Sequence, residues 1–294
     1  MSIAPLAWKR LIRFIPRSGG QALIGQPTDA NQDVGLASRE GQEIRAEVFD
    51  GSSVLQAGKP TGKIELVERL LSPLAMHEVG TIRCIGLNYQ KHADEAHAEV
   101  PKVPVLFMKP ETALGDPFPA PTIIPKFTLQ HESADWESEL AVVIGKTAKN
   151  VSEAEALSYV LGYTASNDVS SRFSQFEQSQ WCFSKSFDGA CPIGPAIVST
   201  ELIPDVSALH MRGLKNGKVM QNSGLDDLIF SVPKIISFIS QGTSLRPGTI
   251  ILTGTPSGVG GMMNPKEHLR EGDEFAVEIL PHIGTLVNRF EHEK

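Results

Sequence analysis

The sequence predicts a mixed α/β fold that is mainly β-stranded, and three observations support this prediction. Apolar residues make up 41% of the 294 residues, which is enough for a packed core. Several segments alternate apolar and polar residues with the period of two that is typical of strands, as at Phe275, Val277 and Ile279. Helical spacing is confined to a few segments that do not alternate regularly with strands, which argues against a doubly wound parallel sheet.

The chain begins with a predicted strand. Apolar and basic residues alternate over Trp8–Pro16, and Ser18–Gly20 supplies a turn after them. No acidic residue occurs before Asp29, whereas four lysines and arginines do, so a transit peptide is the alternative interpretation of this segment.

A domain boundary is expected near residue 78. Gly51–Gly62 is rich in glycine, proline and serine and is predicted to be a loop. The apolar residues of Lys63–His77 have helical spacing, which predicts a helix that closes a small β-rich domain over residues 1–78. Residues 79–294 then form the larger domain.

The larger domain is predicted to mix strands with a few helices. Trp136–Ile144 is an apolar-rich strand, and Thr249–Gly254 is a second one. An S-x-x-E capping box predicts a helix over Ser152–Gly162. A further helix is predicted over Pro233–Gln241, with Ser231 as its cap.

Composition excludes several classes of protein. The 27 basic and 34 acidic residues give a net charge of −7, which argues against nucleic-acid binding. The longest apolar runs, such as Leu140–Ile144, are far shorter than the ~18 residues needed to cross a bilayer, so no membrane partner is expected. The three cysteines lack CxxC spacing, which excludes a disulfide framework and indicates a reducing compartment. We expect the cytoplasm, with the mitochondrion as the alternative.

Familiar catalytic motifs fail in this sequence. A phosphate loop ending at Gly145 would need glycine where Leu140 stands, and an HExxH motif beginning at His131 would need histidine where Asp135 stands. No G-x-S-x-G elbow occurs. ATP hydrolysis, zinc proteolysis and serine hydrolysis therefore lose support.

Two glutamates in the predicted strand are the most informative feature. Glu137 and Glu139 are two residues apart, so a strand places both carboxylates on one face. Such a pair repels itself unless a cation compensates, and oxygen ligands suit Mg²⁺, Mn²⁺ or Ca²⁺. Asp168 follows another strand-like stretch and could supply a third ligand. The alternatives are an exposed edge-strand pair and a turn at Asn167–Asp168.

Three further residues could act as an acid, a base or a cation. His92 and Glu95 are neighbours if their segment is helical, and a glutamate beside a histidine makes a general base for water. The alternative is a solvated surface pair. Lys185 lies between Phe183 and Phe187, a setting expected to lower its pKa or to direct it at an anion. A lysine that extends from an apolar patch to solvent is the alternative.

Taken together and in order, these segments resemble the fumarylacetoacetate hydrolase superfamily. The resemblance covers about residues 79–292, and the first 78 residues resemble the small variable domain of longer members of the fumarylacetoacetate hydrolase domain-containing protein 2 type. The motifs that carry it are Gly86–Tyr89 with His92 and Glu95, Asp135–Gly145, Asn167–Ser170 with Arg172, Lys185–Asp188 with Cys191–Pro192, and Ile251–Gly260.

The resemblance implies one site with three kinds of residue. They are the metal ligands Glu137, Glu139 and Asp168, the catalytic residues His92, Glu95 and Lys185, and the substrate-binding residues Arg172, Gln175 and Thr255. His92 and Glu95 would activate water from a lid, and Lys185 would stabilise an enolate. The sequence departs from the family at Phe173, where many members have an acid.

The resemblance also implies a mixed β-sandwich roll, a bound Mg²⁺ and a homodimer. The expected reaction is metal-dependent hydrolysis of a C–C bond in a β-diketo acid of acylpyruvate type through a metal-stabilised enolate. An oxaloacetate tautomerase or decarboxylase that acts on a 2-oxo acid at the same site is the alternative. A catalytically silent protein that keeps the metal as a structural element is a third possibility.

Overall fold

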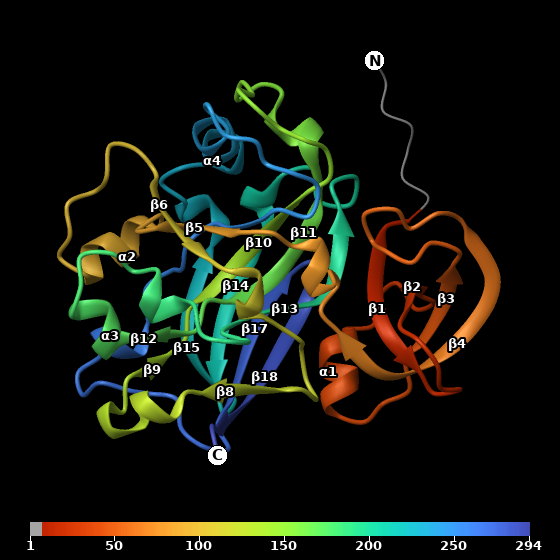
Figure 1. The fold of residues 1–294 in the computed structure, drawn as a ribbon, viewed down its shortest axis with the longest axis horizontal. Helices are drawn as coiled ribbons and strands as arrows, with labels where there is room; N and C mark the ends of the chain where they lie inside the picture. The colour runs from red at the N-terminus through yellow and green to blue at the C-terminus, as the bar shows by residue number, and fades with distance from the viewer. Residues whose placement is uncertain (1–7) are drawn as a thin grey trace.

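The structure is a computed structural model that describes residues 8–294. Its first strands form a small ring: β1 (Arg10–Pro16), β2 (Leu23–Pro27), β3 (Arg45–Phe49) and β4 (Pro60–Leu71). All four pairings around the ring, β1–β2, β2–β3, β3–β4 and β4–β1, are antiparallel (Figure 1). The predicted first strand and the turn after it are thus confirmed, with the amide of Gly19 donating to the carbonyl of Pro16 at 2.9 Å.

The predicted helix over Lys63–His77 is wrong, because β4 occupies most of that range. The pairing of β4 with β1 shifts register, so that Ile15 opposes Arg69 while Pro16 opposes Val67. This bulge lets Val67 and Leu70, three residues apart, both turn into the core. A strand with a bulge therefore imitates the spacing of a helix.

The ring is joined to a large sheet by main-chain pairing. Arg10 and Leu11 of β1 pair with Val198 and Ile197 of β13. After β1 the sheet continues in the order β13 (Cys191–Ser199), β11 (Val160–Asn167), β10 (Ser138–Ile144), β16 (Ile250–Leu252), β5 (Ile82–Gly86) and β6 (Val105–Lys109). We keep the domain boundary near residue 78 as a proposal, since the chain there leaves β4 and is about to enter β5.

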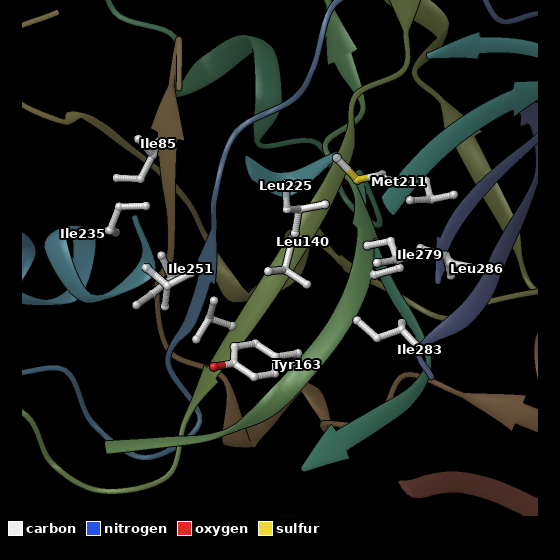
Figure 2. Close-up of a cluster of buried hydrophobic side chains, with 14 of the residues drawn as sticks. Ile85, Leu140, Tyr163, Met211, Leu225, Ile235, Ile251, Ile279, Ile283 and Leu286 are labelled. Carbon is white, nitrogen blue, oxygen red and sulfur yellow. The ribbon is translucent and has the colours of Figure 1, made fainter. Parts of the chain in front are cut away.

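A second sheet covers the first. Its order is β15 (Lys218–Gly224), β14 (His210–Lys215), β17 (Glu274–Leu280), β18 (Gly284–His292) and β8 (Pro121–Ile124). Leu140 from the first sheet and Ile279 from the second meet in one buried apolar cluster (Figure 2). The predicted alternation is confirmed, because Phe275, Val277 and Ile279 are all buried in this cluster. The mainly β, mixed α/β fold is confirmed as well.

Short elements complete the fold. They are α1 (Val34–Arg39), β7 (Leu114–Gly115), β9 (Ala134–Asp135), β12 (Ser170–Ser171), and the helices α2 (Gln90–Glu95), α3 (Arg172–Phe176) and α4 (Val232–Ile239). Helix α4 matches the predicted one, and the Ser231 hydroxyl caps it by accepting the amide of Lys234 at 3.4 Å. In the part of the chain that the structure describes, no helix has the length and apolar character needed to cross a membrane.

The predicted helix over Ser152–Gly162 is wrong. A single 3₁₀ turn covers Ala156–Tyr159, and β11 begins at Val160. The Ser152 hydroxyl donates to the Glu155 carboxylate at 2.6 Å, and the amide of Glu155 donates to the Ser152 carbonyl at 3.2 Å rather than to the hydroxyl, as it would in a capping box. Pairing of β11 with β10 and β13 then determines the conformation of the rest of the segment.

Candidate active site

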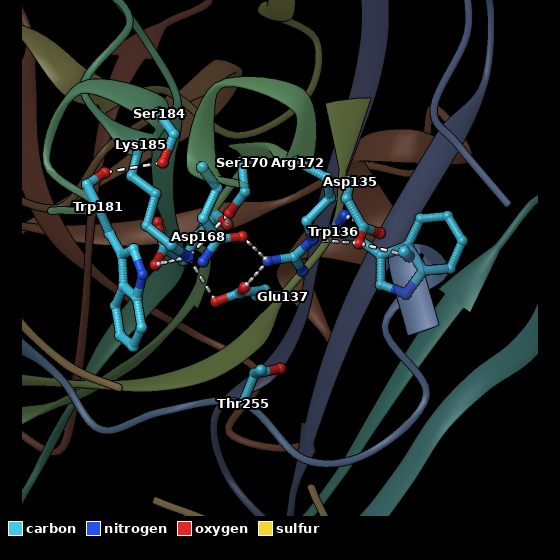
Figure 3. Close-up of polar contacts among 12 residues, drawn as sticks. Asp135, Trp136, Glu137, Asp168, Ser170, Arg172, Trp181, Ser184, Lys185 and Thr255 are labelled. Atoms are coloured by element: carbon cyan, nitrogen blue, oxygen red, sulfur yellow. Dashed lines mark hydrogen bonds and ion pairs between the residues drawn. The ribbon is translucent and has the colours of Figure 1, made fainter. Parts of the chain in front are cut away.

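The nine residues selected from the sequence meet around one cavity of about 210 Å³. Seven of them line it: His92, Glu137, Glu139, Arg172, Gln175, Lys185 and Thr255. Asp168 lies directly behind, within 2.8 Å of the Lys185 ammonium, and Glu95 lies behind His92 at 3.0 Å. Figure 3 shows five of the nine, Glu137, Asp168, Arg172, Lys185 and Thr255, gathered in one place.

Three carboxylates form a candidate metal centre. Oxygen atoms of Glu137, Glu139 and Asp168 lie within 4.8 Å of one another, and all three residues are buried. Glu139 lies in β10 and Glu137 immediately before it, as the alternation predicts. The amide of Asp168 donates to the carbonyl of Glu137 at 2.9 Å, which fixes the third carboxylate beside the first. The alternative of an exposed edge-strand pair is therefore wrong.

The three carboxylates differ in their partners. Burial alone would raise the pKa of Glu137, but the Lys185 ammonium and the Arg172 guanidinium lower it to about 2. Glu139 accepts the amide of Gly254 at 2.5 Å and has no ion-pair partner among residues 8–294. Burial therefore raises the pKa of Glu139 well above its ordinary value, and the neighbouring carboxylates raise it further.

Local charge is consistent with a bound divalent cation. Around the cavity the buried acids are Asp135, Glu137, Glu139 and Asp168, and the buried cations are Lys109, Arg172 and Lys185; the other buried cation among residues 8–294, Arg10, lies in β1. If all four acids are ionised, four negative charges against three positive ones leave one negative charge, at the carboxylate of Glu139, which has no cation of its own; a bound cation would favour this ionised form. Three close carboxylate oxygens are ligands that hard cations prefer. The residues present therefore fit a divalent metal ion.

Lys185 is an ammonium ion held by acids. Its Nζ lies 2.8 Å from Glu137 Oε2, Asp168 Oδ2 and Ser170 Oγ. The expectation of a lowered pKa is wrong: burial would lower it, but the carboxylates of Asp168 and Glu137 raise it above its usual range. The ammonium lies over the ring of Phe107, 5.1 Å from its centroid.

Lys109 is a buried cation that the sequence reasoning missed. Its Nζ donates to Asp168 Oδ1 and, at 2.7 Å, to the carbonyl of Ala190. The alternation of β6 carries the signal, because Phe107 and Lys109 share the buried side while Met108 is exposed. A lysine at an inward position of an apolar strand needs an anion.

Arg172 is fixed by two acids but keeps one free donor. Its Nε donates to Asp135 Oδ2 at 2.6 Å, and its Nη1 donates to Glu137 at 2.7 Å and to Gln175 at 2.8 Å. Its Nη2 is buried and has no partner within residues 8–294. Asp135 in turn accepts the amides of Gly260 and Gly261 at 2.8 Å, so it positions the guanidinium. Sequence reasoning used Asp135 to reject one motif and to begin another that carries the family resemblance, but gave its side chain no role.

The histidine–glutamate pair lies on α2 over the cavity. His92 Nδ1 and Glu95 Oε2 are 3.0 Å apart, as the predicted helical spacing requires. Glu95 Oε1 also accepts the amide of Gly258 at 2.9 Å, which connects α2 to the loop that follows β16. The pair is partly buried, so the alternative of a solvated surface pair is wrong.

Two buried amides hold the loops around the site, and sequence reasoning did not find either role. Asn88 donates to the carbonyls of Phe230 and Thr253 at 3.1 and 2.8 Å and accepts the amide of Phe230 at 2.7 Å. Gln221 donates to Thr255 Oγ1 at 2.7 Å, which leaves the threonine hydroxyl free to donate into the cavity.

The fold and site have a counterpart among known families. A family model described as Fumarylacetoacetate (FAA) hydrolase C-terminal matches residues 81–291. This range is more than half of the chain. The chain therefore belongs to the fumarylacetoacetate hydrolase family.

Two relatives that match nearly the whole chain are named as different enzymes, a hydrolase and a tautomerase. The chain is 46% identical to caffeoylpyruvate hydrolase of Neonothopanus nambi, over 99% of this chain and 97% of that protein. It is 39% identical to oxaloacetate tautomerase fahd2, mitochondrial, of Xenopus laevis, over 98% and 92%. A solved fumarylacetoacetate hydrolase from Exiguobacterium antarcticum superimposes with a TM-score of 0.79 at 28% identity, over 97% of this chain and all of that one.

Proposed function

We propose that this chain is a divalent-metal-dependent hydrolase that cleaves a C–C bond in a β-diketo acid of acylpyruvate type. The observation that carries the proposal is a water-activating pair, His92 with Glu95, on the same cavity as the carboxylate cluster. The similarity to a protein named caffeoylpyruvate hydrolase, across nearly the whole of both chains, supports it.

Glu137, Glu139 and Asp168 would hold the metal, which we propose is Mg²⁺, with Mn²⁺ or Ca²⁺ as alternatives. When bound, such an ion acts as a Lewis acid that offsets negative charge on the substrate oxygens. Lys185, already an ammonium ion, adds a second positive charge beside the same carboxylates.

We assign binding of the substrate carboxylate to Arg172, Gln175 and Thr255. The Nη2 of Arg172 is a charged donor without a partner among residues 8–294, and the ion pair with Asp135 fixes the guanidinium beside the cavity, where a carboxylate would be its complement. Gln175 and Thr255 line the same cavity, and the Thr255 hydroxyl is free to donate there. The distal carbonyl of the substrate then extends toward His92.

In the proposed reaction, water attacks the distal carbonyl carbon while the His92 imidazole takes the proton from that water. The bond between the distal carbonyl carbon and its α-carbon breaks, and its electron pair stays with the pyruvate fragment as an enolate. A proton delivered to that carbon gives pyruvate, and the other product is a carboxylic acid. Glu95 orients His92 and stabilises its protonated form.

The test is His92→Ala with Mg²⁺ and an acylpyruvate. We expect turnover to fall by about 10²–10⁴-fold, the usual contribution of a general base. Mg²⁺ binding measured by calorimetry persists, since His92 is not among the carboxylate ligands. The control is His97→Ala, an exposed histidine five residues along the same segment. Unchanged turnover in His92→Ala would overturn the proposal.

An oxaloacetate tautomerase or decarboxylase is the second candidate, because the chain is 39% identical to a protein named oxaloacetate tautomerase over almost its full length. The same cavity could bind oxaloacetate without a productive water. Incubation with Mg²⁺ and oxaloacetate, followed by enol absorbance and pyruvate release, separates these outcomes. Rapid enol–keto exchange without acylpyruvate cleavage would favour the second candidate.

We also propose a homodimer in a reducing compartment, the cytoplasm or, alternatively, the mitochondrion. Four phenylalanines are exposed near the site: Phe127, Phe173, Phe176 and Phe183. Exposed aromatic groups of this kind favour a covered surface. Light scattering after gel filtration tests the dimer, and Phe183→Glu is expected to shift it toward the monomer.

A further inference from the structure

The cavity is polar at one end and apolar at the other. Its charged side chains gather at the carboxylate end, where Arg172 and Lys185 both contact Glu137. The rest of the wall is mainly apolar, with Ile85, Leu87, Phe107, Phe176, Trp181 and Met262. Among the described residues that line the cavity, no lysine or arginine other than these two occurs. A second carboxylate at the apolar end would find no cation of its own.

Trp181 lies where the two ends meet. Its ring is 5.7 Å from that of Phe107 at an interplanar angle of 75°, an edge-on contact. Phe107 in turn lies 5.1 Å from the Lys185 ammonium. The Ser184 hydroxyl donates to the carbonyl of Trp181 at 2.8 Å, which fixes the turn that carries the indole (Figure 3). The indole therefore forms a wall next to the reacting end.

A glycine in β5 makes room for this wall. A Cβ atom at Gly86 would lie 2.3 Å from Cζ3 of Trp181, well inside van der Waals contact. Any larger residue at this position would push the indole out of its place. The absence of a side chain at Gly86 thus determines where the apolar wall stands.

We infer that the acyl group of the substrate is uncharged and apolar, with a flat aromatic ring as its best occupant, and that Trp181 is the residue that selects it. The inference rests on the proposed hydrolase function for the reacting end. The physical reason is that an aromatic acyl group buries its faces against Trp181, Phe107 and Met262, whereas a charged one loses its hydration without compensation.

The experiment compares three substrates with Mg²⁺: benzoylpyruvate, acetylpyruvate and fumarylpyruvate, whose acyl group carries a second carboxylate. We expect kcat/KM for benzoylpyruvate to exceed the other two by roughly 10–100-fold, the range that a hydrophobic pocket achieves. In Trp181→Ala the ratio of benzoylpyruvate to acetylpyruvate falls at least tenfold, whereas Trp181→Phe keeps most of it. Met108→Ala, at a partly exposed position beside Phe107 on β6, is the matched control and keeps the ratio.

A binding experiment tests this inference independently of the proposed hydrolase function. Calorimetry with the wild-type enzyme and Mg²⁺ measures the affinities of phenylpyruvate and pyruvate, which lack the bond to be cleaved. If none of the three substrates is hydrolysed, the hydrolase proposal fails, yet tighter binding of phenylpyruvate still supports the apolar wall. Equal affinities, or a preference for fumarylpyruvate over benzoylpyruvate, overturn the inference, and this holds even if Trp181→Ala fails to fold.

Discussion

Replacing Glu139 by glutamine is expected to stabilise the metal-free protein. Glu139 is 1% exposed and has two carboxylates as neighbours without an ion-pair partner of its own in the described chain. Glutamine keeps the shape and the oxygen that accepts the amide of Gly254 but carries no charge. The substitution therefore removes the repulsion and retains the hydrogen bond.

The size of the gain follows from proton binding. The pKa of Glu139 is raised above its ordinary value of 4.5 by burial and by Asp168 and Glu137. At pH 7 the destabilisation of the folded state by the Glu139 carboxylate cannot exceed the free energy of protonating that carboxyl group. This free energy is 1.36 kcal/mol for each pH unit above 4.5, or about 3.4 kcal/mol. At pH 5 the limit is about 0.7 kcal/mol.

The sign of the pH dependence follows from the same shift. Between pH 4.5 and the raised pKa of Glu139, the folded state holds a proton that the unfolded state has released, so the free energy of unfolding falls as the pH rises. Glutamine does not titrate. The difference between variant and wild type should therefore grow from pH 5 to pH 7.

Urea unfolding in EDTA at both pH values measures this difference. The control is Glu153→Gln, whose exposed carboxylate pairs with Lys234 and whose loss should change stability by at most about 1 kcal/mol. Mg²⁺ at 1,000 times its Kd reverses the order, because it adds about 4.1 kcal/mol to the wild type, which is more than the limit of about 3.4 kcal/mol. The reasoning is refuted if Glu139→Gln is less stable than wild type in EDTA at pH 7. It is also refuted if the difference in the free energy of unfolding between the two proteins is not smaller at pH 5 than at pH 7.

Two further predictions concern groups outside the reacting cluster. Asn88→Ala leaves three backbone groups without their buried partner, so urea unfolding should show a loss of about 2–4 kcal/mol, and a loss below 1 kcal/mol would contradict the role of this side chain. Burial raises the pKa of the Cys191 thiol to about 11 and that of Cys84 well above its ordinary value. A thiol reagent at pH 8 should therefore modify Cys182 alone in the folded protein and all three cysteines in urea, as mass spectrometry of the labelled peptides would show.

The carboxylate cluster could be predicted because its information is local. Glu137 and Glu139 share a face through the geometry of one strand, and the apolar residues after them indicate that the strand enters a core. His92 and Glu95 are likewise neighbours through one turn of helix. In each pair the distance between the side chains depends on secondary structure alone.

The partners of these residues could not be predicted in this way. Lys109 reaches Asp168 across 59 positions of sequence, and Asp135 reaches Arg172 across 37. Such contacts depend on the order of strands in the sheet, which no local pattern contains. The wrong helix prediction over Lys63–His77 has a related cause. A bulge set by pairing with β1 lets apolar residues three positions apart both face the core, as they would in a helix.

The net charge of −7 is compatible with an anionic substrate once the site is counted separately from the surface. Around the cavity, four buried acids face three buried cations, which leaves one negative charge when all four acids are ionised. A divalent ion held by the carboxylates turns this into one positive charge, which is the complement of a substrate with a single carboxylate. A dicarboxylate would bring one more negative charge than the site then offers. The charge count and the apolar wall beside Trp181 therefore favour the same substrate, an acylpyruvate whose acyl group is neutral.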